Sequence, residues 1–244
     1  CASTRHCRTH TPLYNNLTFI TPGIIMTAPR IFLIHATPVS IAPITEAFNR
    51  LWPEAKLANL LEDSLSGDLA EAGEITEAMN ERFLRLATYA ADCGADAILF
   101  TCSAFGDAID RCKRALPIPV LKPNEAMIEE ALARTRKISI VATFEPAIAS
   151  MTQEFRDYAR QLNVDLELGT VICPGAFGEL RQGNAERHDA LIIDAVRQPT
   201  GSDLLCFAQF SMTSAAQRVS EVSGLDVLTT PDSAVLKLRS LLNA

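Results

Sequence analysis

The feature that most constrains how this chain can fold is an internal repeat, in which three short segments of the first half recur in the second half at almost one spacing. The recurring segments are His35-Ala36-Thr37 with Val141-Ala142-Thr143, Thr101-Cys102-Ser103 with Ala208-Gln209-Phe210, and Lys122-Pro123-Asn124 with Thr230-Pro231-Asp232. The offsets are 106 (143 minus 37), 107 (209 minus 102) and 108 (231 minus 123) residues. Such regularity indicates a duplication, so we expect two similar lobes joined near residue 137.

Each half also alternates short apolar runs with longer stretches of helical periodicity, such as Ile75–Cys93 and Ala147–Leu162. Strands that alternate with helices are typical of parallel α/β sheets. We therefore expect an α/β fold of two pseudo-symmetric lobes, residues 26–137 and 138–244, each with a parallel sheet flanked by helices; the C-terminal helix is free to pack on the first lobe. The runs that we read as buried parallel strands are Ile31–Ile34, Ala55–Asn59, Ala97–Phe100, Val120–Leu121, Ile138–Val141, Leu166–Val171, Leu204–Phe207 and Val227–Leu228.

The composition excludes several classes of partner. The net charge of −7 means that the chain lacks the basic field that attracts nucleic acid or an anionic membrane surface. No apolar run is long enough to cross a bilayer. Seven scattered cysteines, without a C-x-x-C pair or a zinc-like Cys/His spacing, suit a reducing cytoplasm rather than a secreted disulfide scaffold. We expect a cytoplasmic protein with no metal site and no nucleic-acid or membrane partner, and a homo-oligomer is compatible with the sequence.

Residues 1–25 differ from the rest of the chain because they show no periodicity. They contain Cys1, His6, Cys7 and His10. We read this segment as a loose extension outside the catalytic fold rather than as a metal site.

The expected fold locates the functional site before any chemistry is considered, because ligands of open parallel sheets bind at the carboxyl ends of the strands. Cys102 stands at such an end, before a helix expected to start near Asp107. A thiol at a helix N-terminus is favoured as a thiolate, since free amide groups and the helix dipole stabilise the anion. We predict that Cys102 is the reactive group, with donors to a carboxylate from Thr101, Ser103 and the backbone at Ala104.

By the repeat, Gln209 occupies the place in the second half that Cys102 has in the first. Cys206 lies three positions earlier, inside a predicted strand, which indicates a core residue rather than a second reactive thiol. The remaining thiols of the fold, which we expect to be non-catalytic, are Cys93 and Cys112 on helices and Cys173 in a loop.

Other polar residues that follow strands have interpretations that the sequence leaves open. Thr37-Pro38 and Thr143-Phe144 precede helices, so each threonine could cap a helix or contact a ligand. His188-Asp189 resembles a helix start that the aspartate would cap. We expect His35 to be a buried histidine with satisfied hydrogen bonds, and Glu145, next to a proline in a turn, to be solvated.

Several common chemistries lack their motifs. The chain contains no Walker loop, no G-x-G-x-x-G, no G-x-S-x-G elbow and no H-E-x-x-H. These observations argue against nucleotide-binding, dinucleotide-binding and zinc-protease functions.

Taken together, these segments resemble the aspartate/glutamate racemase superfamily, which includes hydantoin racemases, maleate isomerases and arylmalonate decarboxylases. The resemblance runs from about Arg30 to the C-terminus, and the segments that carry it are Thr101-Cys102-Ser103, Val141 to Pro146, Gly183 to Asp189 and Ala208 to Met212. It implies an enzyme without a cofactor that acts on a small carboxylate, with one thiol from each lobe handling the proton α to that carboxylate. Cys102 matches the first thiol, whereas Gln209 stands at the second, where an amide cannot shuttle a proton.

The departure at Gln209 leaves several activities open. A single thiol can protonate the enediolate left by a decarboxylation, or add to an activated double bond as in a maleate-isomerase-like reaction. A relative that has lost its chemistry would only bind a carboxylate. We expect a racemase- or isomerase-superfamily enzyme with Cys102 and Gln209 as the catalytic residues. The substrate-binding residues expected with them are Thr37, Pro38, Thr101, Ser103, Ala104, Thr143, Phe144, Phe210 and Ser211.

Overall fold

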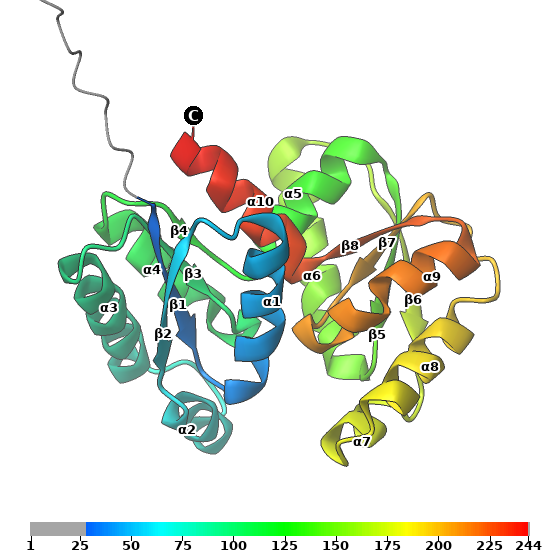
Figure 1. Ribbon diagram of the computed structural model, residues 1–244, viewed down its shortest axis with the longest axis horizontal. Helices are drawn as coiled ribbons and strands as arrows, with labels where there is room; N and C mark the ends of the chain where they lie inside the picture. The colour runs from blue at the N-terminus through cyan, green and yellow to red at the C-terminus, as the bar shows by residue number, and fades with distance from the viewer. Residues whose placement is uncertain (1–27, 244) are drawn as a thin grey trace, which may run out of the picture.

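Eight short strands form two separate four-stranded sheets, one from each half of the chain (Figure 1). The computed structural model describes residues 28–243, so the extension expected at residues 1–25, with its cysteines and histidines, lies outside the described residues. Every strand pairs in parallel with its neighbours. The predicted α/β class with two parallel sheets is therefore confirmed.

The strands lie where the apolar runs predict them. The first sheet has the order β2-β1-β3-β4, with β1 (Arg30–His35), β2 (Lys56–Leu61), β3 (Ala97–Phe100) and β4 (Val120–Leu121). The second sheet has the matching order β6-β5-β7-β8, with β5 (Lys137–Ala142), β6 (Glu167–Ile172), β7 (Leu204–Phe207) and β8 (Asp226–Thr229). The central strands β3 and β7 are buried along their whole length, as strands covered on both faces must be.

Helices follow the strands in both halves, and several begin with a short 3-10 turn, labelled η. In the first half they are η1 (Pro38–Ser40), α1 (Ile41–Leu51), α2 (Ser64–Ala72), α3 (Glu77–Asp92), η2 (Ser103–Phe105), α4 (Gly106–Ala115) and α5 (Glu125–Arg134). In the second half they are α6 (Glu145–Leu162), α7 (Ala176–Arg181), α8 (Ala185–Ala195), η3 (Phe210–Ala215), α9 (Ala216–Ser223) and α10 (Thr230–Asn243). Within residues 28–243, no helix combines the length and the apolar character needed to cross a membrane.

The strand registers place the repeat at an offset of 107 residues for β1, β3 and β4. For β2 the offset is 111 residues (168 minus 57), because residue 31 pairs with 57 and residue 138 with 168. Residue 31 pairs with 97 and residue 98 with 120 in the first sheet, as residue 138 pairs with 204 and 205 with 227 in the second; the differences 138 minus 31, 204 minus 97 and 227 minus 120 are equal. Cys102 and Gln209 are therefore equivalent. The match of Thr37 with Thr143 is wrong by one residue, because Thr37 (φ −156°, ψ 142°) corresponds to Phe144 (φ −153°, ψ 147°) at a helix start.

Two helices are exchanged between the lobes. Helix α5, from the first half, packs through Met127, Ile128 and Ala131 on the apolar face of the second sheet that also carries α6. Helix α10, from the second half, packs with α1 on the first sheet through Val235 and Leu238. Figure 1 shows α10, in red, above the junction of the lobes. The boundary near residue 137 thus separates the sheets in sequence but not the helices that cover them.

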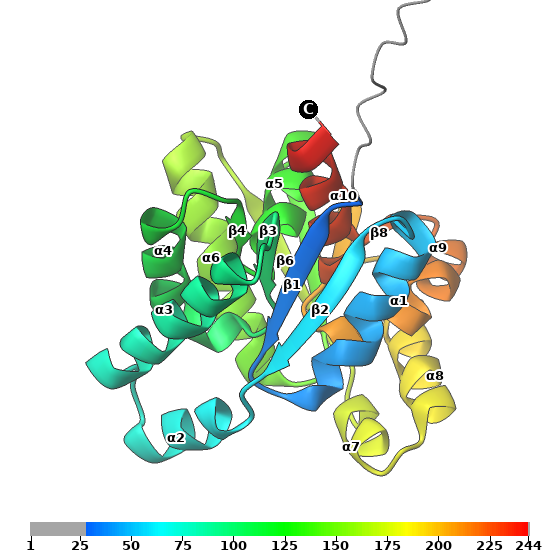
Figure 2. The same cartoon turned by 60° about the vertical axis from the view of Figure 1, so that its left-hand side comes forward.

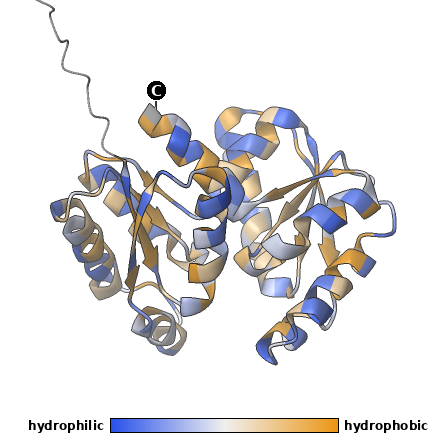
Figure 3. Ribbon diagram, in the orientation of Figure 1, coloured by the Kyte–Doolittle hydropathy of each residue, from blue (hydrophilic) through white to orange (hydrophobic). Residues whose placement is uncertain are grey.

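Each sheet separates two apolar clusters. In the first lobe, α3 and α4 cover one face and α1 with α10 the other. In the second lobe, α8 and α9 cover one face and α5 with α6 the other. Figure 2 shows α1 beside β2, and Figure 3 shows hydrophobic strands between helices of mixed hydropathy. This layering leaves the carboxyl strand ends, rather than the sheet faces, as the place where polar groups gather.

Candidate active site

Cys102 lies between β3 and the η2 turn, directly before Ser103. Its backbone is extended (φ −124°, ψ 117°), and its half-buried side chain packs against the apolar cluster of α3 and α4. Its counterpart Gln209 begins η3 directly after β7 in a similar conformation (φ −140°, ψ 141°). The duplicated fold therefore presents two equivalent backbone positions at strand ends, one with a thiol and one with an amide.

Burial raises the pKa of the Cys102 thiol, and a hydrogen bond from the backbone of Ala104 lowers it by less. The expectation that a helix N-terminus makes this residue a thiolate is therefore wrong. The physical reason is local: a three-residue 3-10 turn separates Cys102 from α4, which begins at Gly106, so the amides of the α-helix are not beside the sulfur. Desolvation then decides the balance, and the neutral thiol is the favoured form.

Gln209 is hydrogen-bonded within its own lobe to Thr143. The backbone N–H of Thr143 donates to Gln209 Oε1 at 2.8 Å, and the Thr143 hydroxyl donates to the same oxygen at 3.0 Å. In return Gln209 Nε2 donates to Thr143 Oγ1 at 2.8 Å. Neither Thr37 nor Phe144, the residues that directly precede η1 and α6, makes a side-chain capping bond. Capping therefore does not explain the threonines, and Thr143 instead fixes the amide of Gln209.

The other predicted residues of the first lobe divide between cleft and interior. Ser103, Ala104 and Pro38 are exposed, and Thr37 is half-buried. The hydroxyl of Thr101 is directed into the protein, because Thr101 is only 7% exposed and its Oγ1 lies 2.8 Å from His35 Nδ1. Cys102 and Thr101 alternate along the extended chain, so their side chains leave opposite faces of the sheet end.

In the second lobe, the predicted residues surround the turn that carries Gln209. Phe144 is partly exposed, and its ring stacks on that of Phe177 from α7 with centroids 5.1 Å apart. Ser211 is half-buried. Phe210 reaches the first lobe and packs against the apolar cluster of α1 and α10. The turn that follows β7 therefore contacts the first lobe.

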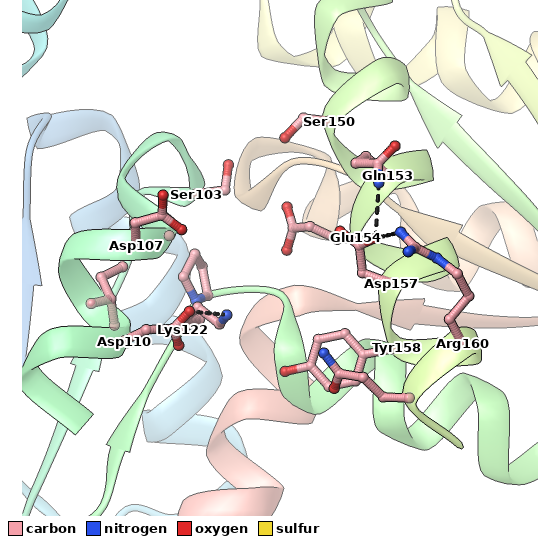
Figure 4. A pocket seen from close by; sticks show the side chains of 14 residues that line it. Ser103, Asp107, Asp110, Lys122, Ser150, Gln153, Glu154, Asp157, Tyr158 and Arg160 are labelled. Atoms are coloured by element: carbon pink, nitrogen blue, oxygen red, sulfur yellow. Dashed lines mark hydrogen bonds and ion pairs between the residues drawn. The ribbon is translucent and has the colours of Figure 1, made fainter. Parts of the chain in front are cut away.

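A cleft of about 670 Å³ opens between the lobes beside Ser103, the neighbour of Cys102. The side chains from η2 and α4 line one wall and those from α6 the other (Figure 4). The residues that line it are Ser103, Gly106, Asp107, Ile109, Asp110, Lys122, Pro123, Ser150, Gln153, Glu154, Asp157, Tyr158, Arg160 and Gln161. The thiol side of the junction thus has open volume that can admit a small molecule.

The cleft carries more acidic than basic side chains. Asp110 is paired with Lys122 Nζ at 3.0 Å, and Asp157 is paired with Arg160. These pairs neutralise much of the charge at the two walls. A carboxylate ligand would therefore find its donors among the hydroxyls and backbone amides at the strand ends rather than in this part of the cleft.

Glu154 extends from α6 toward Asp107 and Ser103 across the cleft (Figure 4). Its Oε1 accepts a hydrogen bond from Asn124 Nδ2 at 2.9 Å. Burial raises the pKa of Glu154, with the Asn124 bond acting in the opposite direction. Burial of this carboxyl therefore opposes its ionisation within the cleft.

The predicted positions of Cys112, Cys173 and Cys206 are confirmed. Cys206 lies in β7 and is fully buried in the second lobe, and burial raises its pKa strongly. Burial also raises the pKa of Cys112, within α4, to about 11 and that of Cys173, in the loop after β6, to about 12. Cys93 ends α3. Cys102 is thus the thiol at a strand end beside the cleft.

His188-Asp189 does not start a helix. Helix α8 runs from Ala185, with Asn184 as the residue before it, so both residues lie inside the helix and the capping interpretation is wrong. Asp189 Oδ1 instead lies 2.8 Å from His188 Nδ1 and accepts a bond from the Ser214 hydroxyl in η3 at 2.9 Å. These contacts tie α8 to the turn that follows Gln209.

Sequence reasoning missed residues that the fold brings to the strand ends. The buried Ser40 and the exposed Asn59 both hydrogen-bond to the ring of His35, and Phe177 stacks on Phe144. A usable signal for Asn59 was its place as a polar residue in an otherwise apolar run. The positions of Ser40 and Phe177 depend on contacts between distant segments, which the periodicity of the sequence does not indicate.

Comparisons with known proteins agree with this architecture. The family model described as Asp/Glu/Hydantoin racemase matches residues 42–238. Among curated proteins, no sequence matches at a significant level. The fold resembles a glutamate racemase isoform from Bacillus anthracis at 13% identity, with a TM-score of 0.65 and coverage of 89% of this chain and 82% of that one.

Two further solved structures share the fold. An allantoin racemase from Klebsiella pneumoniae superimposes with a TM-score of 0.65 at 18% identity, over 88% of each chain. The Gly74Cys mutant of an arylmalonate decarboxylase superimposes with a TM-score of 0.63 at 14% identity, over 88% of this chain and 94% of the other. At these identities the likeness concerns the fold, and both racemases and a decarboxylase are built on it.

Proposed function

Because the chain belongs to the Asp/Glu/hydantoin racemase family, we propose that it is an enzyme of the racemase and isomerase superfamily that acts on a small carboxylic acid through the single thiol of Cys102, without a cofactor. The observation that carries the proposal is the asymmetry of two equivalent strand ends: Cys102 follows β3 beside an open cleft, and Gln209 follows β7. An amide cannot exchange a proton with a carbon acid near neutral pH, so the chemistry falls to one side of the substrate.

The protonation state of Cys102 favours a specific role for this thiol. Burial raises its pKa, so the sulfur holds its proton and is suited to donate it to a carbanion. In a decarboxylation, the bond between the α-carbon and a carboxylate breaks, carbon dioxide leaves, and the electron pair forms an enediolate. The Cys102 proton then passes to the α-carbon, and the thiolate recovers a proton from water. The raised pKa therefore favours the lyase as the second candidate function.

The isomerase reaction uses the same sulfur as a nucleophile. The Cys102 thiolate would add to an activated carbon–carbon double bond, the resulting single bond would rotate, and elimination would return the thiolate and the isomerised acid. This route needs the substrate to lower the pKa of the thiol, since burial raises it. The two routes thus differ in which form of Cys102 starts the reaction.

We propose that the substrate carboxylate lies at the strand ends rather than deep in the cleft. The exposed Ser103 hydroxyl, the backbone at Ala104 and the amide of Gln209 offer donors there. Gln209 is held for this task, because Thr143 fixes its carbonyl oxygen through two bonds and leaves one amide hydrogen of Nε2 for a ligand.

The proposal is tested by incubating candidate carboxylic acids with the enzyme in deuterated water. Proton NMR follows deuterium incorporation at the α-carbon, and a coupled assay follows carbon dioxide. Deuterium incorporation or isomerisation without carbon dioxide supports the isomerase, whereas stoichiometric carbon dioxide release supports the lyase. Saturable binding of the acids without either reaction would overturn the proposal and indicate a carboxylate-binding relative.

A further inference from the structure

A buried polar cluster lies at the carboxyl end of the first sheet. We call it the His35 cluster; its members are the buried His35, Ser40 and Thr101, together with Asn59, which is exposed at the rim. His35 Nδ1 lies 2.8 Å from Thr101 Oγ1 and 3.0 Å from Ser40 Oγ, and the two hydroxyl oxygens are 2.8 Å apart. On its other side, His35 Nε2 lies 3.0 Å from Asn59 Oδ1. The cluster therefore ties together the ends of β1 and β3, the strand β2 and the turn η1.

The hydrogen bonds of the His35 cluster are satisfied by a neutral imidazole. Nε2 faces a carbonyl oxygen and so carries the ring hydrogen, which leaves Nδ1 to accept the hydroxyl hydrogen of Thr101. Ser40 donates to the backbone carbonyl of Thr37 at 3.1 Å or to Thr101. His35 is 1% exposed, so these contacts replace water for a group that would otherwise be costly to bury.

The second lobe provides an internal comparison for the His35 cluster. At the offset of 107 residues, the positions of His35, Ser40 and Thr101 fall on alanines, namely Ala142, Ala147 and Ala208. Ala208 packs against the apolar cluster of α5 and α6. The same strand order and the same strand ends thus form with methyl groups at these positions. The fold does not require the polar cluster, and the cluster occurs in the lobe that carries the thiol.

The His35 cluster is adjacent to both first-lobe turns that border the proposed site. Thr101 directly precedes Cys102, and Ser40 closes the η1 turn back onto the carbonyl of Thr37. We infer that His35 is a positioning residue, which through Thr101 and Ser40 fixes the turn that carries Cys102 relative to the turn that carries Thr37. This inference rests on the proposed function, in which Cys102 is the reactive group, and it assigns His35 no contact with the substrate.

The inference is tested by the reactivity of each cysteine in the intact protein. Iodoacetamide alkylation is measured against pH, with each thiol read separately by mass spectrometry, in wild type and in Thr101→Val, which removes the hydroxyl and keeps the shape. Loss of the anchor should let Cys102 gain solvent, so the midpoint of its alkylation should move down toward that of a free thiol. Below the midpoint, Cys102 should therefore be alkylated several-fold faster than in wild type.

Matched variants separate positioning from general destabilisation. Thr101→Ser keeps the hydroxyl and should restore the slow alkylation of Cys102. Ser139→Ala, which removes a buried hydroxyl from β5 of the other sheet, should leave Cys102 at the wild-type rate. Cys112 and Cys206 are fully buried and should stay protected in every variant. Ser40→Ala is a milder second variant should Thr101→Val fail to fold, and it should shift Cys102 in the same direction.

The outcomes distinguish this inference from the proposed function. Unchanged Cys102 alkylation in Thr101→Val and Ser40→Ala would overturn the role of His35, whatever the enzyme turns over. Equal exposure of Cys102, Cys112 and Cys206 would also overturn it, because it would mean a general loosening. A shift confined to Cys102 supports the inference even if no carboxylic acid is converted by the wild type.

Discussion

Replacing Gln209 with Leu tests whether the bonds between Gln209 and Thr143 hold the second strand end. The change keeps the size of the side chain and removes three contacts of 2.8, 3.0 and 2.8 Å. It leaves the backbone N–H of the buried Thr143 without its acceptor. A net hydrogen bond contributes about 1 kcal/mol, and an unpaired buried donor costs about 1–3 kcal/mol. Because Gln209 is half-buried, water can replace part of the loss, and we expect about 2 kcal/mol.

The assay is urea denaturation of a double-mutant cycle with Thr143→Val, which removes only the threonine hydroxyl. Thr143→Val alone should cost about 1 kcal/mol, and the double variant should cost about 2 rather than about 3 kcal/mol, a coupling energy of about 1 kcal/mol. The thermal midpoint of Gln209→Leu should fall by roughly 4–8 °C. As a control, Gln161→Leu on the exposed surface of α6 should change stability by less than about 0.5 kcal/mol. A coupling energy below about 0.3 kcal/mol would refute the reasoning.

Three further predictions concern charge and the second strand end. Burial lowers the pKa of His35 from 6.5, so the stability that His35 contributes is present above pH 6.5 and is lost as the pH falls through 6.5 toward the folded pKa. The difference in stability between wild type and His35→Gln, measured by urea denaturation at several pH values, should therefore shrink on acidification. A constant difference would contradict this prediction. Lys113→Met removes the 2.6 Å ion pair of the buried Glu125 and should cost about 2 kcal/mol near pH 7, less than a fully buried pair because the lysine is one-third exposed. Burial raises the pKa of Glu125, so this cost should decrease as protonation relieves the carboxylate at lower pH, and a pH-independent cost would count against it. Gln209→Cys places a thiol opposite the first and should make an optically active product racemic; an unchanged enantiomeric ratio by chiral chromatography would contradict the equivalence of the two positions.

The strands and the repeat could be predicted because they depend on local pattern. Buried parallel strands are short apolar runs, and β3, β4 and β7 have the predicted bounds. The equivalence of Cys102 with Gln209 followed from the repeat alone. The match of Thr37 with Thr143 is one residue out of register because it pairs identical residue types. The backbone instead aligns Thr37 with Phe144 at the start of a helix.

What the sequence could not predict depends on contacts between distant segments. Helices α5 and α10 have apolar faces that identify them as packed, but periodicity does not say which sheet each one covers. The raised pKa of Cys102 arises from tertiary burial, whose effect on the pKa exceeds that of the local hydrogen bond from the backbone of Ala104. The two ends of the bond between His35 and Thr101 are 66 residues apart. Gly183 indicates a helix start nearby but not its first residue, because α8 begins at Ala185 and already contains His188.

The role of Cys102 is tested most directly by measuring the turnover of two variants, each lacking one thiol, on whichever acid the wild type converts. Cys102→Ala removes the thiol at the strand end, and Cys206→Ala removes one that is buried in the core of the other lobe. With both variants shown to be folded by circular dichroism, we expect Cys102→Ala to lose at least about 100-fold in turnover and Cys206→Ala to retain the wild-type rate. Wild-type turnover by Cys102→Ala would contradict the account.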